Sequence, residues 1–396
     1  MRRLKWELCS SPERVSVPIY LDYNATTPLD LRVRDSMLRW LSGPPANASS
    51  LHAYGQEARR AIDTARLQVA LLIGAQPEEI VFVSGGTEAN NLAILGAVAA
   101  RGVSKPHVVT TAIEHQAVLN PCRQVERLGG RVTFVPVDPS GVVQVKAVLE
   151  AVSEDTVLVS VMLANNEVGT LQPVGELVRA LRGRGVLVHT DAVQAAGKIP
   201  IDVRALGVDL LSLSAHKLHG PQGVGALYVR RGTRIGAILF GGHQERELRP
   251  GTENVAGIAG FGTACALARE RLEEDTRHLM QLRERLEKGL KERIEGVTIH
   301  AETAPRLPNT TNAGFAGLDG EALVINLDLM GVLASTGAAC ASADGEPSHV
   351  LVAMGLDRAE ARSSVRFSFG RDTTEEEIDR AIDIIVQAVE RLRGGA

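Results

Sequence analysis

Short apolar runs alternate with longer amphipathic stretches through the first two thirds of the chain. The runs are rich in β-branched residues and nearly continuous in their apolar character, which is typical of strands covered on both faces. This alternation of strands and helices predicts an α/β fold, with helices on both sides of a mostly parallel seven-stranded sheet. The expected strands are Ile80–Val83, His107–Thr111, Arg131–Val135, Val157–Met162, Val186–His189, Asp209–Leu213 and Gly223–Val229, and the clearest helices between them are Thr87–Ala100 and Ala117–Leu128.

The pattern changes after Thr252. Residues 254–295 form one long helical stretch, which is followed by expected strands near Thr298–His300 and Thr311–Phe315 and by a last helix, Glu375–Leu392. Two threonines before three glutamates give that helix a capping residue and an acidic first turn. We therefore expect a large domain over residues 18–270 and a smaller α+β domain over residues 271–396, joined by the N-terminal segment 1–26. Residues 1–17 are expected to form a loosely held tail.

Composition narrows the class of protein. The 396 residues are 44% hydrophobic and 23% charged with a net charge of −4, an ordinary globular mixture that argues against a nucleic-acid-binding protein. The four cysteines are scattered, which favours a reducing cytoplasm over a disulfide framework. No apolar run is long enough for a membrane span, and the N-terminus lacks the apolar centre of a signal peptide.

Polar residues follow the expected strands at their carboxyl ends. In an open parallel sheet, ligands bind at that edge, so these side chains are expected to lie around one site. Any one of them could be a helix cap or a surface residue, but five such groups are hard to explain without a ligand, because burying polar groups is costly. The groups are Ser84–Asn91, Glu114–Gln116, Asn165–Thr170, Asp191–Gln194 and Ser214–Lys217.

These residue types fit the three chemical handles of pyridoxal phosphate. A neutral Lys217 amine can form a Schiff base with an aldehyde. Asp191, 26 positions earlier, can pair with a protonated ring nitrogen, and His115 can lie flat on the ring. The Gly-Gly-Thr start of the helix after Ile80–Val83, together with Ser214 and His216, can hold a phosphate.

With these residues, the chain resembles a cysteine desulfurase of the NifS/IscS type, in the class-V aminotransferase family of fold-type I pyridoxal-phosphate enzymes. The resemblance covers nearly all of the chain from Ile19 to the last helix. Its motifs are Ile19–Pro28, Ser50–His52 with Tyr54–Gly55, Ser84–Asn91, Glu114–His115, Asn165–Glu167, His189–Gln194, Ser214–Lys217 with Gly220–Pro221, Gly241–Thr252, the segment around Cys340 and Val365–Ser368.

The resemblance implies a role for each matching residue. Lys217 would hold the cofactor and move protons, Asp191 would pair with the pyridinium, and His115 would stack on the ring and act as acid or base. Gln194 and Asn166 would lie beside the phenolic oxygen or the substrate, and the phosphate would be held by Gly86, Thr87, Ser214 and His216. Thr252 would reach the phosphate of the partner subunit in a homodimer. Arg366 would bind the substrate carboxylate, near the turn formed by Asn24, Ala25 and Thr26.

Cys340 lies among small residues and glycines without hydrophobic periodicity. These flanks favour a reactive thiol on a mobile loop over a buried structural cysteine. Cys122 and Cys265 are expected to pack inside helical segments, and Cys9 to be incidental. The resemblance implies that L-cysteine becomes L-alanine while its sulfur passes to Cys340 as a persulfide, and then to a sulfur-acceptor or iron–sulfur scaffold protein. No metal ion is expected in the site.

Other classes remain open on the residues alone. Another pyridoxal-phosphate enzyme, such as a selenocysteine lyase, a cysteine-sulfinate desulfinase or an aminotransferase, would use the same cofactor residues, and an aminotransferase would not need Cys340. A non-catalytic binding or assembly protein could retain the fold without binding the cofactor. A metal enzyme is less favoured, because there is no His-Glu-x-x-His motif and His216 and His219 are better interpreted as a phosphate ligand and its neighbour.

Overall fold

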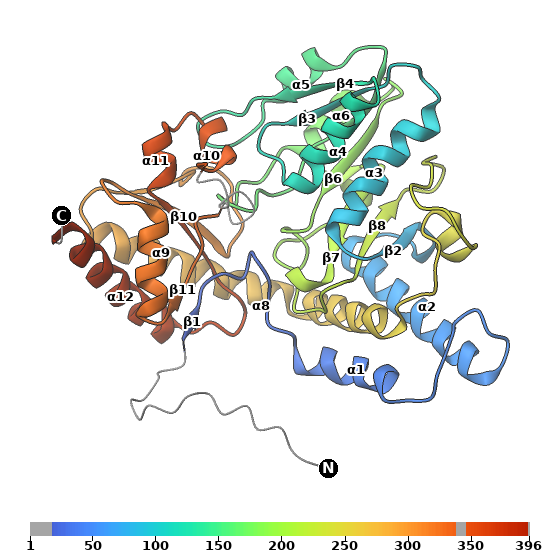
Figure 1. Ribbon diagram of the computed structural model, residues 1–396, viewed down its shortest axis with the longest axis horizontal. Helices are drawn as coiled ribbons and strands as arrows, with labels where there is room; N and C mark the ends of the chain where they lie inside the picture. The colour runs from blue at the N-terminus through green and yellow to red at the C-terminus, as the bar shows by residue number, and fades with distance from the viewer. Residues whose placement is uncertain (1–17, 338–345, 395–396) are drawn as a thin grey trace.

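The computed structural model describes residues 18–337 and 346–394. A seven-stranded sheet forms the centre of the larger part of the molecule (Figure 1), as the strand pattern predicted. Its strands run in the order β2-β8-β7-β6-β5-β3-β4, and all are parallel except β8, which is antiparallel to both of its neighbours. They are β2 (Ile80–Val83), β3 (His107–Thr111), β4 (Arg131–Val135), β5 (Thr156–Ser160), β6 (Leu187–Asp191), β7 (Leu210–Ser214) and β8 (Gly225–Val229).

Strand β6 continues two residues beyond the expected end at His189. Thr190 pairs with Leu211 and Asp191 with Ser212 in the β7 register, so the ladder runs through residues that are not apolar. Strand pairing needs only backbone N–H and C=O groups, whereas the expected boundary followed side-chain hydrophobicity. This extension places the Asp191 side chain at the carboxyl edge of the sheet.

Helices cover both faces of the sheet. One face packs with α3 (Gly86–Arg101) and α4 (Gln116–Arg127), where Leu92, Val118 and Cys122 join the apolar strand residues. The other face packs against a larger core that includes Ile62, Leu177 and Phe261. The helices of that second layer include α2 (Ala53–Ile73), α6 (Val174–Leu181) and the first half of α8 (Val255–Arg293), with α1 (Leu31–Leu41), α5 (Val145–Ala151) and α7 (Val203–Leu206) beside them.

Helix α8 runs along the lower part of the view in Figure 1 from the large sheet to a smaller α+β unit. Its residues up to Ala268 belong to the first core, whereas Leu279, Leu282, Leu286 and Leu290 belong to a second one. The second core also includes Ile19 and Leu21, so the N-terminal segment packs with the C-terminal unit. The division at residue 270 stays a prediction.

An antiparallel sheet in the order β12-β10-β9 lies at the centre of this smaller unit. Its last helix begins at Glu375, as the capping pattern predicted, and continues to Gly394. The elements are β9 (Val297–Ile299), β10 (Thr310–Phe315), β12 (Ser364–Ser368), α9 (Gly320–Leu329), α10 (His349–Ala353), α11 (Arg358–Arg362) and α12 (Glu375–Gly394), with a parallel pair formed by β1 (Ile19–Tyr20) and β11 (Val332–Leu333).

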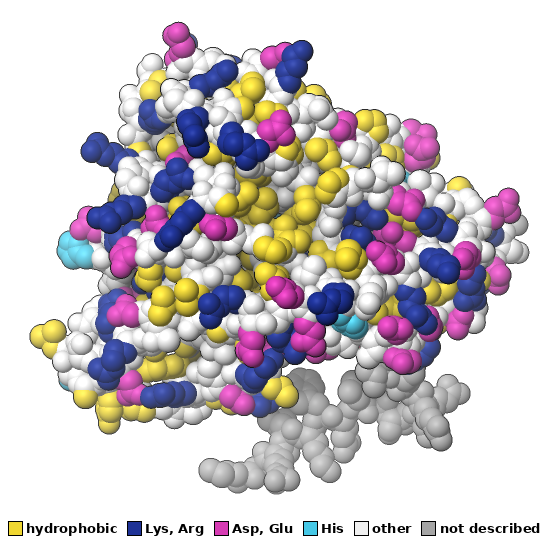
Figure 2. All heavy atoms as spheres, turned by 180° about the vertical axis from the view of Figure 1, so that it is seen from behind, with side chains coloured by type: hydrophobic (Ala, Val, Ile, Leu, Met, Phe, Trp, Pro, Cys, Tyr) yellow, Lys and Arg dark blue, Asp and Glu magenta, His cyan; other side chains and the backbone are white. Residues whose placement is uncertain are grey.

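Acidic and basic side chains are intermixed over the face shown in Figure 2, with apolar side chains between them. This surface does not have the continuous basic stripe that phosphate-backbone binding requires. In the parts of the chain that the structure describes, no helix combines the length and apolar character needed to cross a membrane.

Candidate active site

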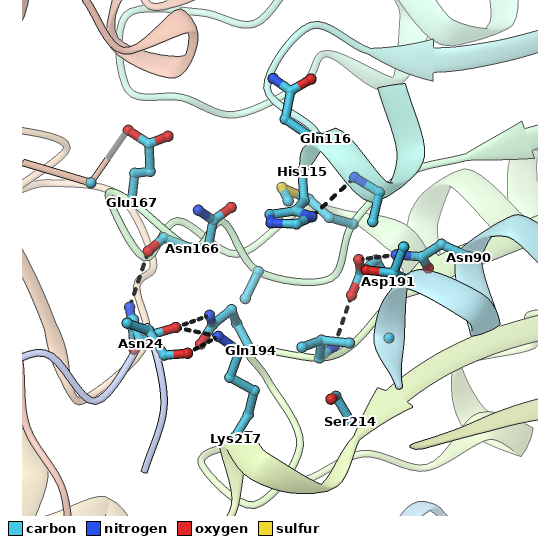
Figure 3. A pocket seen from close by; sticks show the side chains of 18 of the residues that line it. Asn24, Asn90, His115, Gln116, Asn166, Glu167, Asp191, Gln194, Ser214 and Lys217 are labelled. Atoms are coloured by element: carbon cyan, nitrogen blue, oxygen red, sulfur yellow. Dashed lines mark hydrogen bonds between the residues drawn. The ribbon is translucent and has the colours of Figure 1, made fainter. Parts of the chain in front are cut away.

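A cavity of about 340 Å³ lies at the carboxyl ends of the parallel strands, between the large sheet and the smaller unit. Its volume is in the range of small-molecule sites. The lining comes from the strand ends, from the N-terminal turn and from β12 (Figure 3). The residues are Asn24, Ala25, Gly86, Thr87, Asn90, His115, Gln116, Ala117, Met162, Ala164, Asn166, Glu167, Asp191, Val193, Gln194, Ser214, His216, Lys217, Gly337, His349 and Arg366.

Asp191 is held in place by two donors. The Asn90 Nδ2 atom, one turn into α3, lies 2.7 Å from Asp191 Oδ2, and the Val193 backbone N–H donates to Oδ1 at 2.9 Å. Asp191 is 6% exposed, so its carboxylate has little contact with solvent. Two hydrogen bonds of this kind, one to each carboxylate oxygen, fix the position of the carboxylate. The arrangement can pair with a cationic group in the cavity.

Lys217 lies in a short 3₁₀ helix, η2 (Ala215–Lys217), directly after β7. Its Nζ atom donates to the carbonyl oxygens of Asn24 at 2.5 Å and Ala25 at 2.7 Å. Asn24 is itself fixed, because its Nδ2 donates to the Asn166 carbonyl at 3.1 Å and to Thr310 Oγ1 at 2.9 Å. The N-terminal turn therefore orients the amine, as Figure 3 shows.

His115 caps the start of α4. Its Nδ1 atom accepts a hydrogen bond from the Ala117 backbone N–H at 3.0 Å, which requires an unprotonated Nδ1 and leaves the ring proton on Nε2. Burial lowers the pKa of His115, and the nearby Asp191 charge opposes that shift only in part. The ring is therefore neutral at pH 7 and is available as a flat surface and, through its Nε2–H, as a hydrogen-bond donor.

The N-terminus of α3 offers a cradle for an anion. Gly85 caps this helix without a side-chain hydrogen bond, so the first N–H groups keep their capacity to bind a ligand. A Cβ at Gly86 would come within 2.8 Å of Val193 Cγ2, so only glycine fits here without a shift. Thr87, Ser214 and His216 line the same end of the cavity.

His216 is neutral beside this cradle. Its Nδ1 atom lies 3.1 Å from Thr26 Oγ1. Burial first, and then the positive charges of Lys217 and Lys198, lower the pKa of His216 to about 4. At neutral pH the ring can therefore take part in a hydrogen bond to an anion but supplies no charge.

Arg366, on β12, brings a cation from the smaller unit. Its Nη2 atom donates to Asp22 Oδ1 at 2.6 Å and its Nη1 atom to the Asn166 carbonyl at 3.1 Å. The side chain is almost fully buried, and its Nε has no hydrogen-bond partner among the described residues. Arg366 also lines the cavity, and each of its Nη atoms has a second hydrogen, so the guanidinium has donor capacity that suits a carboxylate ligand.

Known proteins are similar to this chain over nearly all of its length. The family model described as aminotransferase class-V matches residues 19–381. A cysteine desulfurase IscS of Dictyoglomus turgidum is 45% identical over 375 residues, which are 95% of each chain, and one of Vibrio campbellii is 48% identical over 96% of this chain and 94% of that protein. The chain belongs to the cysteine desulfurases of the class-V aminotransferase family.

Two solved structures agree with this family. A protein described as NifS-like superposes with a TM-score of 0.89 at 40% identity, over 95% of this chain and 100% of that one. A structure described as SspA in complex with cysteine gives a TM-score of 0.81 at 36% identity, over 90% of this chain and 100% of that one. The fold-type I architecture expected from the resemblance is therefore confirmed, and cysteine desulfurases of this family use pyridoxal phosphate.

The donors and acceptors that line the cavity of this cysteine desulfurase fit pyridoxal phosphate. A fixed carboxylate, an amine and a helix N-terminus with a glycine at its first residue all face one cavity, and they match the ring nitrogen, the aldehyde and the phosphate. His115 supplies the flat surface for the ring. The fit rests on Asp191, Lys217, Gly86 and His115, and these four residues stand at the ends of four different strands: β6, β7, β2 and β3.

The cavity brings together most of the residues that the sequence singled out in this cysteine desulfurase. Three lie elsewhere or are not described. Thr26 lines an adjoining hollow on the other side of His216, and Thr252 is exposed and does not line the cavity. Cys340 lies outside the described residues. The roles of all of these residues stay predictions.

Sequence reasoning did not assign a role to several lining residues. Asn90 is the clearest, since it holds Asp191 from α3. Its position four residues after Gly86 on the same helix was the available signal, but nothing in the sequence placed α3 beside the end of β6. His349 also lines the cavity without having been predicted to do so, and Glu167, which was expected there within Asn165–Thr170, had no role assigned to it.

Proposed function

We propose that this protein converts L-cysteine to L-alanine and transfers the sulfur to its own Cys340. The C–S bond of the substrate breaks, an S–S bond forms with the enzyme thiol, and the alanine carbon gains the hydrogen that replaces sulfur. L-Cysteine plus thiol thus gives L-alanine plus persulfide. Both sulfur atoms are oxidised by one electron each and the carbon is reduced by two, so no external oxidant is needed.

The observation that supports the role of Cys340 is the position of its neighbours in the chain. Gly337, the last described residue before Cys340, lines the cavity, and so does His349, at the start of α10. His349 is fixed there by a hydrogen bond from its Nε2 to the Glu114 carbonyl at 2.9 Å. The chain therefore leaves the cavity wall and returns to it on either side of the cysteine.

We assign the cofactor to the residues that fit its handles. Asp191 would hold the ring nitrogen, His115 the ring face, and Gln194 the phenolic oxygen. The phosphate would lie on the α3 N-terminus with Gly86, Thr87, Ser214 and His216. When bound, pyridoxal phosphate supplies an electron sink for the charge that develops at the substrate Cα.

Two side chains would act on the substrate directly. The Lys217 amine, once released from the Asn24 and Ala25 carbonyls, would take the proton from Cα and return it. Arg366 would bind the substrate carboxylate through donor capacity not used by Asp22 and Asn166. The Asn166 side chain and the Asn24–Thr26 turn would complete the substrate side of the cavity.

We further propose a cytoplasmic homodimer that passes the persulfide sulfur to an acceptor or iron–sulfur scaffold protein. Thr252 is exposed, away from the cavity of its own chain, as a residue that serves the partner subunit must be. Phe240, eleven residues before Gly251, is 89% exposed, which suits a subunit contact. Two described cysteines, Cys122 and Cys265, are free thiols, as expected in a reducing compartment.

The test compares Cys340→Ala with Cys122→Ala after each is loaded with pyridoxal phosphate. We expect Cys340→Ala to keep the visible cofactor band but to lose at least about 100-fold in alanine formation from L-cysteine, because the nucleophile is gone. Cys122→Ala should retain turnover, since burial raises the pKa of that thiol to about 12. Wild-type turnover in Cys340→Ala would overturn the role of Cys340, and a wild-type protein that stays colourless with the cofactor would overturn the proposed function.

A further inference from the structure

Lys198 is a buried lysine directly behind the cavity. It is 6% exposed, and it lies four residues after Gln194 in the turn that follows β6. Its backbone is fixed by its own N–H, which donates to the Ala195 carbonyl, and by its carbonyl, which accepts from Thr276 Oγ1 on α8. The proposed reaction does not use this residue, and burying an amine costs free energy unless its N–H groups are hydrogen-bonded.

The Lys198 amine contacts two oxygens of a single residue. Its Nζ atom lies 3.0 Å from the Gln194 backbone carbonyl and 3.0 Å from the Gln194 side-chain Oε1. Two acceptors match the two N–H groups of a neutral amine, whereas an ammonium would need a third. Burial, and then the charges of Lys217 and Arg366, lower the pKa of Lys198 to about 7.

Other charged groups surround the same position. His219 and Arg371 line a small hollow with Lys198 and Lys217, and Asp275 on α8 lines it as well. Arg371 contacts the Asp275 carboxylate at 3.9 Å, so the acid is shared with a permanent cation. None of these neighbours gives Lys198 a carboxylate partner. Among the described residues, Gln194 supplies both oxygens that the Lys198 Nζ atom contacts.

Lys198 settles which way the Gln194 amide points. With Oε1 toward Lys198, the Gln194 Nε2 atom donates to the Asn24 carbonyl at 2.9 Å. A rotated amide would place two acceptors against each other at Asn24, and at Lys198 the amine would have to accept a hydrogen bond instead of donating one. Because Nε2 has two hydrogens and Asn24 takes one, the second is left for the cavity that Gln194 lines.

We propose that Lys198 is a positioning residue that holds the Gln194 amide with its N–H toward the phenolic oxygen of the cofactor. The inference rests on the proposed function, since it assigns Gln194 to that oxygen. A donor at the phenolic oxygen stabilises negative charge there. It therefore lowers the pH at which the bound cofactor loses its proton, a midpoint that is visible as a pH-dependent change of the absorption band.

The experiment measures that midpoint in the loaded enzyme without substrate. In Lys198→Met the amide is no longer held, and we expect the midpoint to rise by about 0.5 to 1 pH unit, the effect of one weakened hydrogen bond. Gln194→Leu should raise the midpoint similarly, and the double variant should add nothing further, because both changes remove one interaction. Thr276→Val is the matched control: it removes the hydrogen bond to the Lys198 carbonyl but keeps both Nζ contacts, and it should leave the midpoint unchanged.

Lys198→Gln replaces Lys198→Met if that variant does not fold. The amide of the new glutamine is one bond shorter than the lysine side chain and cannot reach Gln194 Oε1, so the same rise of the pH midpoint is expected. An unchanged midpoint in a folded Lys198 variant would overturn the proposal, and so would a full second shift in the double variant, which would indicate a direct charge effect. A role in packing alone would lower the unfolding temperature without moving the midpoint, whereas a colourless wild-type protein would overturn the proposed function instead.

Discussion

The buried His189 side chain connects strands of the large sheet through hydrogen bonds. From β6 its Nδ1 atom lies 2.8 Å from Ser160 Oγ on β5, and its Nε2 atom lies 3.0 Å from Ser212 Oγ on β7. One ring therefore joins three neighbouring strands just before the Asp191 end of β6. Its environment is closed to solvent, and burial lowers the pKa of His189 to about 3.

This burial makes the folded state sensitive to acid. The folded pKa lies below the ordinary value of 6.5, so below pH 6.5 the unfolded chain binds a proton that the folded chain excludes. The contribution of His189 is complete above pH 6.5 and is lost progressively as the pH falls toward 3. Between pH 7 and pH 5 the loss amounts to about 2 kcal/mol of unfolding free energy.

We therefore predict that His189→Gln loses about 2 kcal/mol less stability than the wild type when the pH is lowered from 7 to 5. The variant is less stable at pH 7, because glutamine cannot bridge both serines in the same way. Urea unfolding at the two pH values, at equal cofactor loading, measures the difference. The other buried histidines are common to both proteins, so equal losses in the two would contradict the pKa given for His189.

At the scale of elements, the contact between α2 and α8 depends on a glycine. A Cβ at Gly262 would lie 2.5 Å from Ala65 Cα and 2.6 Å from Ala65 Cβ, so the two helix backbones approach as closely as they can. Gly289, in the same helix, faces the Cδ1 end of Ile382 on α12, a side chain that can change its rotamer. One helix thus has a rigid contact toward the large sheet and an adaptable one toward α12.

Gly262→Ala should destabilise the protein by about 1 to 3 kcal/mol, because the added methyl group must push two helices apart. The loss is expected even though alanine raises helix propensity by about 1 kcal/mol. Gly289→Ala gains the same propensity and meets side-chain atoms of Ile382 and no backbone atoms, so it should cost less. Chemical unfolding of both variants makes the comparison, and equal costs would show that the backbone contact with α2 does not limit α8.

At the scale of the whole molecule, the site depends on parts that pack into two different cores. Lys217 and Asp191 follow strands of the large sheet, whereas the chain that supplies the Asn24 carbonyl and Arg366 packs with the smaller unit. Arg366 contacts both Asn166 and Asp22, so its position requires both units to be folded. A shared homodimeric site would add a third source of residues.

Mixing inactive subunits tests that shared site. Lys217→Ala lacks the amine, and we expect Thr252→Ala to lose cofactor phosphate affinity in the partner's site. When the two variants are unfolded, mixed and refolded together, each mixed dimer should regain one complete site, because the intact Lys217 and Thr252 meet across the interface. Each variant refolded alone is the control. No recovery of alanine formation in dimers shown to be mixed would place Thr252 in the site of its own chain, and full activity of Thr252→Ala refolded alone would place Thr252 outside the site.

Some of this organisation could be read from the sequence, for local reasons. Continuous apolar runs indicated buried strands such as β3, and polar residues at their ends indicated the site, because parallel strands present their carboxyl ends at one edge. No helix or strand was expected between residues 27 and 79, where α1 and α2 form. The end of β6 was placed too early, because strand pairing does not depend on apolar side chains.

By itself, the sequence determined the kind of sheet, the edge at which the ligand binds and the residue types that match pyridoxal phosphate, since these follow from periodicity and from functional groups close together in the chain. Only the tertiary structure decided that Asn90 holds Asp191, that the Asn24 carbonyl orients Lys217 from 193 residues away, and that Lys198 faces the Gln194 amide. These contacts depend on how whole elements pack and on which way a side chain turns. A one-dimensional pattern of polar and apolar residues contains neither kind of information.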